Sequence, residues 1–578
     1  MVAAVAAALV FAIRPSGPRV LSAAAGQPTL WRGAYHVHST QSDGSGTPEE
    51  IAAAAAAEEL DFVILTDHGD ATRTPAAPRV VDGVLLIDAV EISTDDGHYV
   101  ALDLPAAPYP LAGEGRAVAE DVRRLGGIGL IAHPDSPRAS LAWHDPSVPA
   151  DGFEWINGDS TWRTASSSHL LTRLLAYPLN RAGTLAGLAT YPATLFAERD
   201  QPSRPPQLAL AAVDAHARIG WQRNADPIEG GRALAKFPSY RASFGTFGIV
   251  MAWLDGGPSG DARRDAGAVL HAIRQRATWS AVFSMADRAW LSFDLVDAAT
   301  GTSQGPDLRG AATAVVRSNG PAGARLRVLR NGQIYREQEA AELSEPLPAD
   351  EPGAVYRAEL WLPARRGWPA LPIALSSARG HNLTELDLMA TGNREPAIEG
   401  AGTGDRRPGT AVSPQGTTPD ARAAVDVDIR GWHVEHDPES SGAVMPDAPE
   451  VRAQATLQLA SGGRRSQFSA LVADLAPPPA GTTGLELDLS ASAPMRISVQ
   501  WREPRPGEGL RWRHSSYVDG TQRRVVLPIS EFRPIRPASG AVPLDRVHAL
   551  LLVMDTVNGR PGDARSVTVH AARWTRGR

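Results

Sequence analysis

The sequence predicts an α/β protein in which a β/α barrel is followed by two all-β, sandwich-like domains. Three observations support this prediction. Apolar runs typical of buried strands alternate with helical patterns as far as about residue 288, which favours a parallel sheet. Several of these runs end in histidine or a carboxylate, as expected where barrel strands end at a site. Beyond residue 289, short alternating runs continue without helices, as in a β-sandwich.

Length and composition restrict the function. A chain of 578 residues is expected to form about three to four domains. The net charge is -7, and the sequence contains no cluster of basic residues. Nucleic acid is therefore not an expected partner. The absence of cysteine excludes disulfides and thiolate ligands. Any metal must therefore be held by histidine and carboxylate.

The first 25 residues resemble a signal peptide or an N-terminal anchor. An apolar run reaches Ile13, and an A-x-A cleavage pattern ends at Ala25. The run is too short for a stable transmembrane span, so we expect export to the periplasm or the medium. No basic residue precedes the run, and an Ala-rich N-terminal extension is the alternative.

Residues 26–288 carry the barrel pattern. A capping threonine at Thr47, followed by Pro48 and Glu50, marks the start of a helix. Further helices are predicted over 115–125 and 262–277, and 159–204 is a helical insertion that we expect to pack rather than to act as a lid. The predicted strands are 62–68, 84–93, 98–104, 128–133, 152–157 and 208–216.

The remainder is predicted to be β structure. A small β-sandwich spans 289–388, and Asn331-Gly332 marks a hairpin within it. A Gly-, Pro- and Thr-rich linker covers 389–422, and a jelly-roll-like β-sandwich covers 423–578. Trp501, Trp512 and Tyr517 could form an aromatic platform for glycan contact, although core packing is the commoner role of such residues.

The segment W-R-G-A-Y-H-V-H-S-T-Q-S-D-G places His36 and His38 two residues apart, with Asp43 close behind. In a regular strand, both imidazoles would point to the same face and could share a metal ion. Taken alone, a strand with two incidental histidines is the commoner explanation. Six more candidate ligands follow at predicted strand ends and in nearby loops: His68, Glu91, His98, His133, Asp214 and His216. This set is large enough for two or three ions, with Glu91 as the expected bridge.

The ordered motifs H-V-H-S with S-D-G, T-D-H, V-E-I-S, G-H-Y, I-A-H-P and D-A-H resemble the PHP (polymerase and histidinol phosphatase) metallohydrolases. The resemblance implies a distorted seven-stranded β/α barrel with two or three Mn, Zn or Fe ions, usually acting on phosphoesters. It assigns His36, His38, Glu91 and Asp214 to one ion, Glu91, His98 and His133 to a second, and Asp43, His68 and His216 to a third. A solvated loop histidine is the alternative for His98.

The W-R-G lead-in and the later G-W-P-A-L-P-I-A-L-S segment look more like an exported branch that includes carbaryl hydrolase, which opens a carbamate. Ala34 and Tyr35 stand where the family opening usually has an acidic residue, a departure that affects strand packing more than ligands.

We therefore expect a metal-dependent hydrolase, phosphoesterase-like, in which a hydroxide bridging two ions attacks a small-molecule ester. The alternatives are hydrolysis of carbamate or other carboxylic esters at the same site, and an inactive barrel in a carbohydrate- or cell-surface-binding protein. Asp67 is expected to orient a ligand imidazole or to cap its strand. Arg163 and Arg241 are expected to bind an anionic substrate group or to form surface salt bridges.

Overall fold

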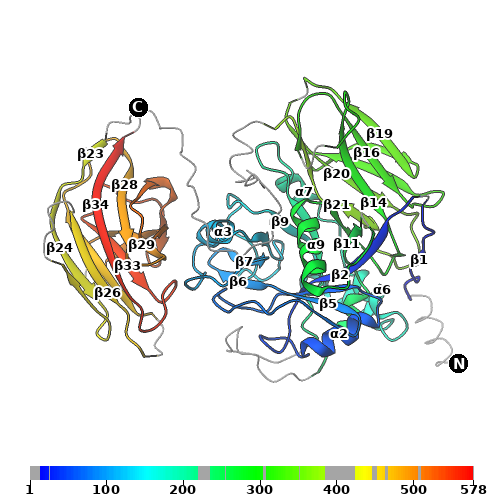
Figure 1. The fold of residues 1–578 in the computed structure, drawn as a ribbon, viewed down its shortest axis with the longest axis horizontal. Helices are drawn as coiled ribbons and strands as arrows, with labels where there is room; N and C mark the ends of the chain where they lie inside the picture. The colour runs from blue at the N-terminus through cyan, green and yellow to red at the C-terminus, as the bar shows by residue number, and fades with distance from the viewer. Residues whose placement is uncertain are drawn as a thin grey trace. The chain divides into compact units, whose positions relative to one another are not determined.

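A computed structural model describes residues 14–24, 26–218, 235–253, 256–303, 307–350, 352–383, 424–445, 452–462, 466–504 and 509–576. The chain divides into two compact units (Figure 1). Unit 1 comprises 1–106 and 118–394, and unit 2 comprises 107–117 and 395–578. The predicted signal peptide and linker lie, except for residues 14–24, outside the described residues.

Unit 1 contains a five-stranded sheet in the order β10-β9-β8-β7-β6 and a larger sheet whose path is β15-β22-β20-β21-β12-β11-β2-β3-β5-β4. The strands are β1 Arg19–Val20, β2 Thr29–Val37, β3 Phe62–Leu65, β4 Arg79–Val81, β5 Val84–Asp88, β6 Val90–Thr94, β7 Gly97–Leu102, β8 Ile128–Ile131, β9 Gly152–Asn157, β10 Leu208–Ala212, β11 Gly248–Trp253, β12 Thr278–Ala281, β13 Ala286–Asp287, β14 Leu291–Asp297, β15 Asp307–Leu308, β16 Ala312–Ser318, β17 Arg325–Arg330, β18 Gln333–Glu339, β19 Glu342–Leu347, β20 Ala354–Trp361, β21 Ala374–Ser376 and β22 Arg379–His381. The helices are α2 Pro48–Ala56, α3 Gly115–Arg124, which crosses the boundary between the units, α4 Gly158–Thr164, α5 Ser167–Leu174, α6 Arg181–Ala186, α7 Ala193–Arg199, α8 Tyr240–Phe244 and α9 Ala262–Arg274.

Two isolated bridges connect the sheets at the strand ends that carry predicted ligands: Val37 pairs with Ala215, and His68 pairs with Glu91. One apolar core draws its side chains from both sheets and from α9, including Tyr35, Ile64, Leu130 and Leu210. Mixed α/β architecture is thus confirmed. The described strands that carry the predicted ligands lie in two bridged sheets, and these do not form a continuous seven-stranded barrel.

The predicted strand 84–93 is in fact two strands. β5 ends at Asp88, and β6 then pairs antiparallel with β7 in a hairpin. Consequently Glu91 and His98 lie on an antiparallel hairpin and not at the ends of parallel strands. The helix starting at Pro48 has the full capping box, because Thr47 and Glu50 each accept the other's backbone N–H.

The described residues between 289 and 383 form β structure within unit 1. β14, β16 and β19 make a three-stranded sheet, while β21 pairs with β12 and so continues the large sheet. The predicted hairpin is present between β17 and β18: Asn331 and Gly332 have φ of 51° and 74°, the left-handed values that a type I′ turn needs.

Unit 2 contains two six-stranded sheets around one apolar core, as in a β-sandwich. Its elements are β23 Ala424–Asp426, β24 Ile429–His436, β25 Ser441–Val444, β26 Ala453–Gln458, β27 Phe468–Leu475, β28 Thr482–Ala491, β29 Met495–Glu503, β30 Leu510–Val518, β31 Arg523–Pro528, the 3₁₀ helix η1 Ile529–Glu531, β32 Arg533–Ile535, β33 Ala549–Asp555 and β34 Ala564–Arg576. Trp501 and Trp512 are buried in this core, which confirms the core packing that the sequence favoured over a platform for both residues. The hydroxyl of Tyr517 donates to Asp519 at 3.0 Å.

Among the described residues, no helix combines the length and apolar character needed to cross a membrane.

Candidate metal centre

His36 and His38 lie close together at the end of β2, but not because side chains alternate along a regular strand. The pairing of β2 with β3 shifts register between Tyr35 and Val37, so that His36 is the extra residue of a bulge. Its φ of 65° lies in the left-handed region, which is rare for a residue with a side chain. The two Nε2 atoms then lie 3.1 Å apart. The predicted convergence is present, but a bulge creates it and not the two-residue repeat of a regular strand.

Glu91 lies at the centre of the cluster, and its two oxygens face different histidines. Oε1 lies 2.8 Å from His98 Nδ1 and 3.0 Å from His133 Nε2. Oε2 lies 3.2 Å from the Nε2 atoms of both His36 and His38. A carboxylate placed between two groups of imidazoles has the arrangement of a bridging ligand.

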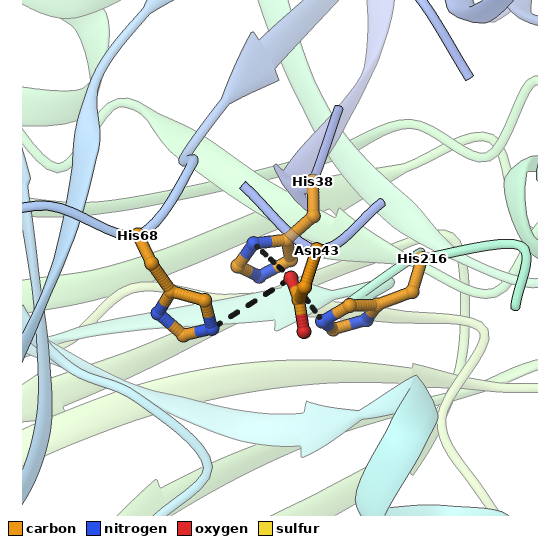
Figure 2. A group of neighbouring side chains, drawn as sticks. All are labelled: His38, Asp43, His68 and His216. Atoms are coloured by element: carbon orange, nitrogen blue, oxygen red, sulfur yellow. Dashed lines mark ion pairs between the residues drawn. The ribbon is translucent and has the colours of Figure 1, made fainter. Parts of the chain in front are cut away.

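A second carboxylate, Asp43, lies between three imidazoles that come from distant parts of the chain (Figure 2). Its Oδ1 is 3.2 Å from His216 Nε2, 3.5 Å from His38 Nδ1 and 3.8 Å from His68 Nε2. Asp43 and His216 are 23% and 22% exposed, whereas His38 is fully buried. The cluster therefore reaches solvent on the Asp43 side.

Asp214 completes the set. Its Oδ1 lies 3.5 Å from His36 Nε2, 3.6 Å from His38 Nε2 and 3.4 Å from His216 Nδ1. Asp214 also has a positive φ of 45°, so the backbone holds this ligand in an unusual conformation too.

All nine predicted ligands occur in four groups whose donor atoms lie within 4.8 Å of one another. These groups are His38, Asp43, His68 and His216; His36, His38 and Glu91; His36, His133 and Asp214; and His68, Glu91 and His98. The groups differ from the sets that the resemblance implies, because His38 also faces Asp43, and His133 also faces Asp214.

Three buried atoms that could bind a metal make no hydrogen bond with the described residues, although charged groups lie near them. They are Asp43 Oδ1, His68 Nδ1 and Asp214 Oδ1. An unpartnered buried polar atom costs about 1–3 kcal/mol, so native proteins usually satisfy such atoms. Imidazole nitrogens and carboxylate oxygens converging on one region are a ligand set for divalent cations such as Zn²⁺, Mn²⁺ or Fe²⁺. The residues present therefore fit divalent metal ions.

The electrostatics of the cluster favour positive charge between its carboxylates. Burial disfavours the imidazolium of His38, but Asp214, Glu91 and Asp43 outweigh burial and raise the pKa of His38 to about 10. Burial would raise the pKa of Glu91 and Asp43, yet the surrounding imidazoles lower both. At His68 burial dominates, against the attraction of Glu91, and lowers the pKa to about 4.

Sequence reasoning missed Glu154. This residue lies on β9 and contacts two of the ligands, His36 and His133. Its Oε1 lies 2.6 Å from His36 Nδ1, and its Oε2 accepts the backbone N–H of His133 at 2.8 Å. Such a carboxylate fixes the orientation of an imidazole whose other nitrogen faces a metal. The available signal was a lone carboxylate within the apolar run G-F-E-W-I.

Tyr240 was also missed. Its hydroxyl donates to the backbone carbonyl of His38 at 2.8 Å and accepts the N–H groups of Ser45 and Gly46 at 3.1 Å. Burial raises the pKa of this phenol to about 12, so it stays protonated and continues to donate. Through these hydrogen bonds, Tyr240 connects the segment after Asp43 with the end of β2.

Asp67 does not contact a ligand imidazole directly. It accepts the N–H and hydroxyl of Ser39 at 2.7 and 2.6 Å and the hydroxyl of Ser42 at 2.6 Å. Ser42 Oγ in turn lies 3.4 Å from His38 Nδ1. Asp67 therefore holds the ligand-bearing loop and reaches the His38 imidazole through Ser42, and its role in orienting that imidazole stays a prediction.

Arg163 and Arg241, the predicted contacts for an anionic substrate group, each pair with a carboxylate of the protein. Arg163 pairs with Asp159 on its own helix and lies over the Trp162 ring. Arg241 is 60% exposed and pairs with Glu58 at 2.6 Å. For both residues, the salt-bridge alternative describes the contacts that are present.

No protein-family model and no curated protein matches this sequence. Solved structures show distant similarity. A two-domain protein of Bacteroides vulgatus, described as containing a predicted PHP-like metal-dependent phosphoesterase, is 12% identical and covers 63% of this chain and 99% of its own, with a TM-score of 0.26. The family 11 carbohydrate-binding module of a cellulosomal cellulase of Clostridium thermocellum is 12% identical over 26% of this chain and 96% of its own, with a TM-score of 0.21. These TM-scores are too low to establish a shared fold, so neither similarity assigns a family or an activity to this chain.

Proposed function

We propose that this protein is a metal-dependent hydrolase of phosphoesters that belongs with the PHP metallohydrolases. The observation that carries the proposal is the position of Glu91: its Oε1 faces His98 and His133, and its Oε2 faces His36, His38 and His68, at 2.8–3.3 Å. Sites that hold two cations about 3.5–4 Å apart around a shared carboxylate are typical of phosphatases and nucleases. The order of the ligand motifs along the chain supports the same assignment.

Each ion would have its own part of the cluster. Glu91 would be shared, with His98 and His133 on its Oε1 side and His36, His38 and Asp214 on the side of Oε2. Asp43, His68 and His216 would hold a third ion nearest to solvent. When bound, divalent cations supply charge that polarises a phosphoryl or carbonyl oxygen and lowers the pKa of water.

The protein's own residues hold this arrangement before substrate arrives. Glu154 orients His36, and the carbonyl of Leu141, 3.2 Å from His133 Nδ1, orients His133. Tyr240 and Asp67 hold the loop between His38 and Asp43. Ligands fixed in this way need little rearrangement when charge develops on the substrate, which is the usual source of electrostatic catalysis.

Metal reconstitution and a substrate panel test the proposal. The metal-free protein would be loaded with Mn²⁺, Zn²⁺ or Fe²⁺, its metal content measured by elemental analysis, and turnover followed on phosphomonoesters, phosphodiesters and carbamates. We expect about two to three ions per chain and phosphoester turnover. Turnover of carbamates or other carboxylic esters alone would support the alternative suggested by the exported-branch resemblance.

Glu91→Gln is the decisive variant, and Glu49→Gln on the exposed surface of α2 is its matched control. Gln cannot bridge two cations as a carboxylate does, so Glu91→Gln should lose metal and turnover while Glu49→Gln retains both. A fully loaded protein that hydrolyses no ester in the panel contradicts the proposal. Equal metal content and activity in Glu91→Gln and the parent would also contradict it.

A further inference from the structure

A cavity of about 380 Å³ lies beside the metal centre and has no assigned occupant. Its wall includes His133, one of the nine ligands, and Glu154, which contacts His36. The rest of the wall comes from the ends of β8 and β9 and from the helical insertion, with Thr161 and Thr164 on α4. Ligand pockets usually enclose about 300–1,000 Å³, so this cavity is large enough for a small organic group.

A second cavity borders Asp214 and His216 but measures only about 40 Å³. That volume holds one or two waters and no organic group. Of these two cavities, only the larger one can hold the part of an ester that extends away from its reacting centre.

The charge of the larger cavity argues against an anionic ligand. The described residues that line it include the carboxylates of Asp135 and Glu154 but no arginine or lysine. Recognition of phosphate or carboxylate normally uses arginine, lysine or clustered backbone N–H groups. A second anionic group on the substrate would meet like charge here.

Two threonine hydroxyls in the wall already donate their protons to backbone carbonyls. Thr161 Oγ1 donates to the carbonyl of Asn157 at 2.6 Å, and Thr164 Oγ1 donates to that of Ser160 at 2.7 Å. A threonine hydroxyl has one proton and two lone pairs, so both side chains can only accept further hydrogen bonds. With the Asp135 carboxylate they make an acceptor-rich wall, and Trp155 and Leu188 add apolar surface.

We infer that this cavity binds the alcohol portion of the substrate as an uncharged, hydroxyl-rich group such as a sugar or polyol; the inference rests on the proposed function. Ligand hydroxyls can donate to Thr161, Thr164 and Asp135, while the C–H faces of the ligand contact Trp155 and Leu188. Because His133 belongs both to the cavity wall and to the candidate ligand set, the ester bond of such a group would lie beside the metal centre.

Ligand-observed saturation-transfer NMR tests this inference on the metal-free full-length chain, so turnover is not required. The probes are methyl glucoside and its charged counterpart, methyl glucuronide. We expect the neutral glucoside to bind and the glucuronide to bind several-fold more weakly. If the protein then fails to hydrolyse any ester, the proposed function falls while the cavity assignment stands.

The double variant Thr161→Val/Thr164→Val removes both acceptors, and Thr172→Val is its matched control. Thr172 makes the same backbone-directed bond, to Ser168 at 2.7 Å, but does not line the cavity. Loss of one neutral hydrogen bond weakens binding by about two- to tenfold, so the double variant should bind the glucoside at least about fivefold more weakly. Thr172→Val should bind like the parent.

A variant that fills the cavity, Ala165→Trp, provides a second measurement and should abolish glucoside binding, with thermal melting used to confirm that each variant folds. Three results overturn the inference: no binding of the glucoside by the parent, equal or tighter binding of the glucuronide, or glucoside binding that is unchanged in both the double variant and Ala165→Trp. The last result would place the sugar elsewhere on the chain.

Discussion

The carboxylate of Glu154 lies 2.6 Å from Nδ1 of His36, while Nε2 of the same imidazole faces Glu91 at 3.2 Å. His36 thus has an orienting carboxylate on one nitrogen and the metal centre on the other. This relationship fixes which nitrogen is free to bind a cation.

Replacing Glu154 should therefore weaken metal binding without removing a ligand. Glu154→Gln keeps the size of the side chain but removes the charge that holds His36. We expect about 10- to 100-fold weaker metal affinity, measured by competition with a chelator. Glu198→Gln, on the exposed face of α7, is the control and should match the parent. An unchanged affinity in Glu154→Gln would show that Glu154 does not orient His36.

Asp43→Ala should lower metal content by about one ion per chain, because Asp43 contributes the only carboxylate of the group formed with His38, His68 and His216. Elemental analysis after dialysis measures this loss directly. The exposed Asp70→Ala provides the comparison and should keep full stoichiometry. Equal metal content in Asp43→Ala and the parent would remove Asp43 from the ligand set.

Gly44→Ala should disturb the centre through backbone crowding. A Cβ at Gly44 would lie 2.2 Å from the carbonyl oxygen of His38, so the loop carrying Asp43 must shift. We expect metal affinity to fall roughly tenfold or more. Gly267→Ala in α9 meets nothing within 4 Å and should bind metal normally. Both variants can be compared by the same chelator titration.

Asp200→Ala should destabilise unit 1 strongly. Arg357 is fully buried and donates to both oxygens of Asp200, at 2.7 and 2.8 Å. Removing one partner leaves a buried charge uncompensated, which costs about 3–5 kcal/mol of unfolding free energy. Asp103→Ala breaks an exposed pair with Arg274 and should cost about 0–1 kcal/mol. Urea unfolding measures both, and similar losses in the two variants would contradict the expectation.

Unit 2 should lose stability in acid through Glu435. Its hydrogen bonds to Arg502, at 2.7 and 2.9 Å, lower the pKa of Glu435 to about 2 from an ordinary value of 4.5. Because the folded pKa is lower than the unfolded one, the stabilisation is complete above about pH 4.5 and disappears as the pH falls towards about 2.

Pulsed hydrogen exchange in increasing urea, at about pH 6, 4 and 2, follows this loss in peptides from β24 and β29. Glu435→Gln lacks the titrating group, so the difference in stability between parent and variant should shrink as the pH falls. A difference that stays constant across this range would mean that Glu435 does not titrate with folding.

Local sequence patterns were informative where chemistry and short-range geometry coincide. The capping box at Thr47 and the Asn331-Gly332 turn are both present, because each depends on residues three or fewer positions apart. The nine candidate ligands were identified from residue types at strand ends, and the fold brings them together. Predictions that depended on long-range strand register were less accurate. The strand expected over 84–93 is two strands, β5 and β6, and the bulge at His36 was not predicted.

Glu154, Tyr240 and the alternative contacts of Asp67 could not be predicted from the sequence, since each depends on which strands and loops become neighbours. Glu154 is 118 positions from His36, and Tyr240 is 202 from His38. The roles of Trp501 and Trp512 were likewise settled only by their burial between two sheets.

The sequence by itself determined the chemistry available to this protein: a candidate ligand set of six histidines and three carboxylates, no thiol, and an order of motifs that resembles a metallohydrolase family. Tertiary structure decided how that chemistry is arranged. Which oxygen of Glu91 faces which imidazole, which buried atoms are left without partners, and which cavity adjoins the centre all depend on contacts between segments far apart in the chain. Burial then gives those contacts their electrostatic strength, because charges removed from water interact more strongly than charges exposed to it.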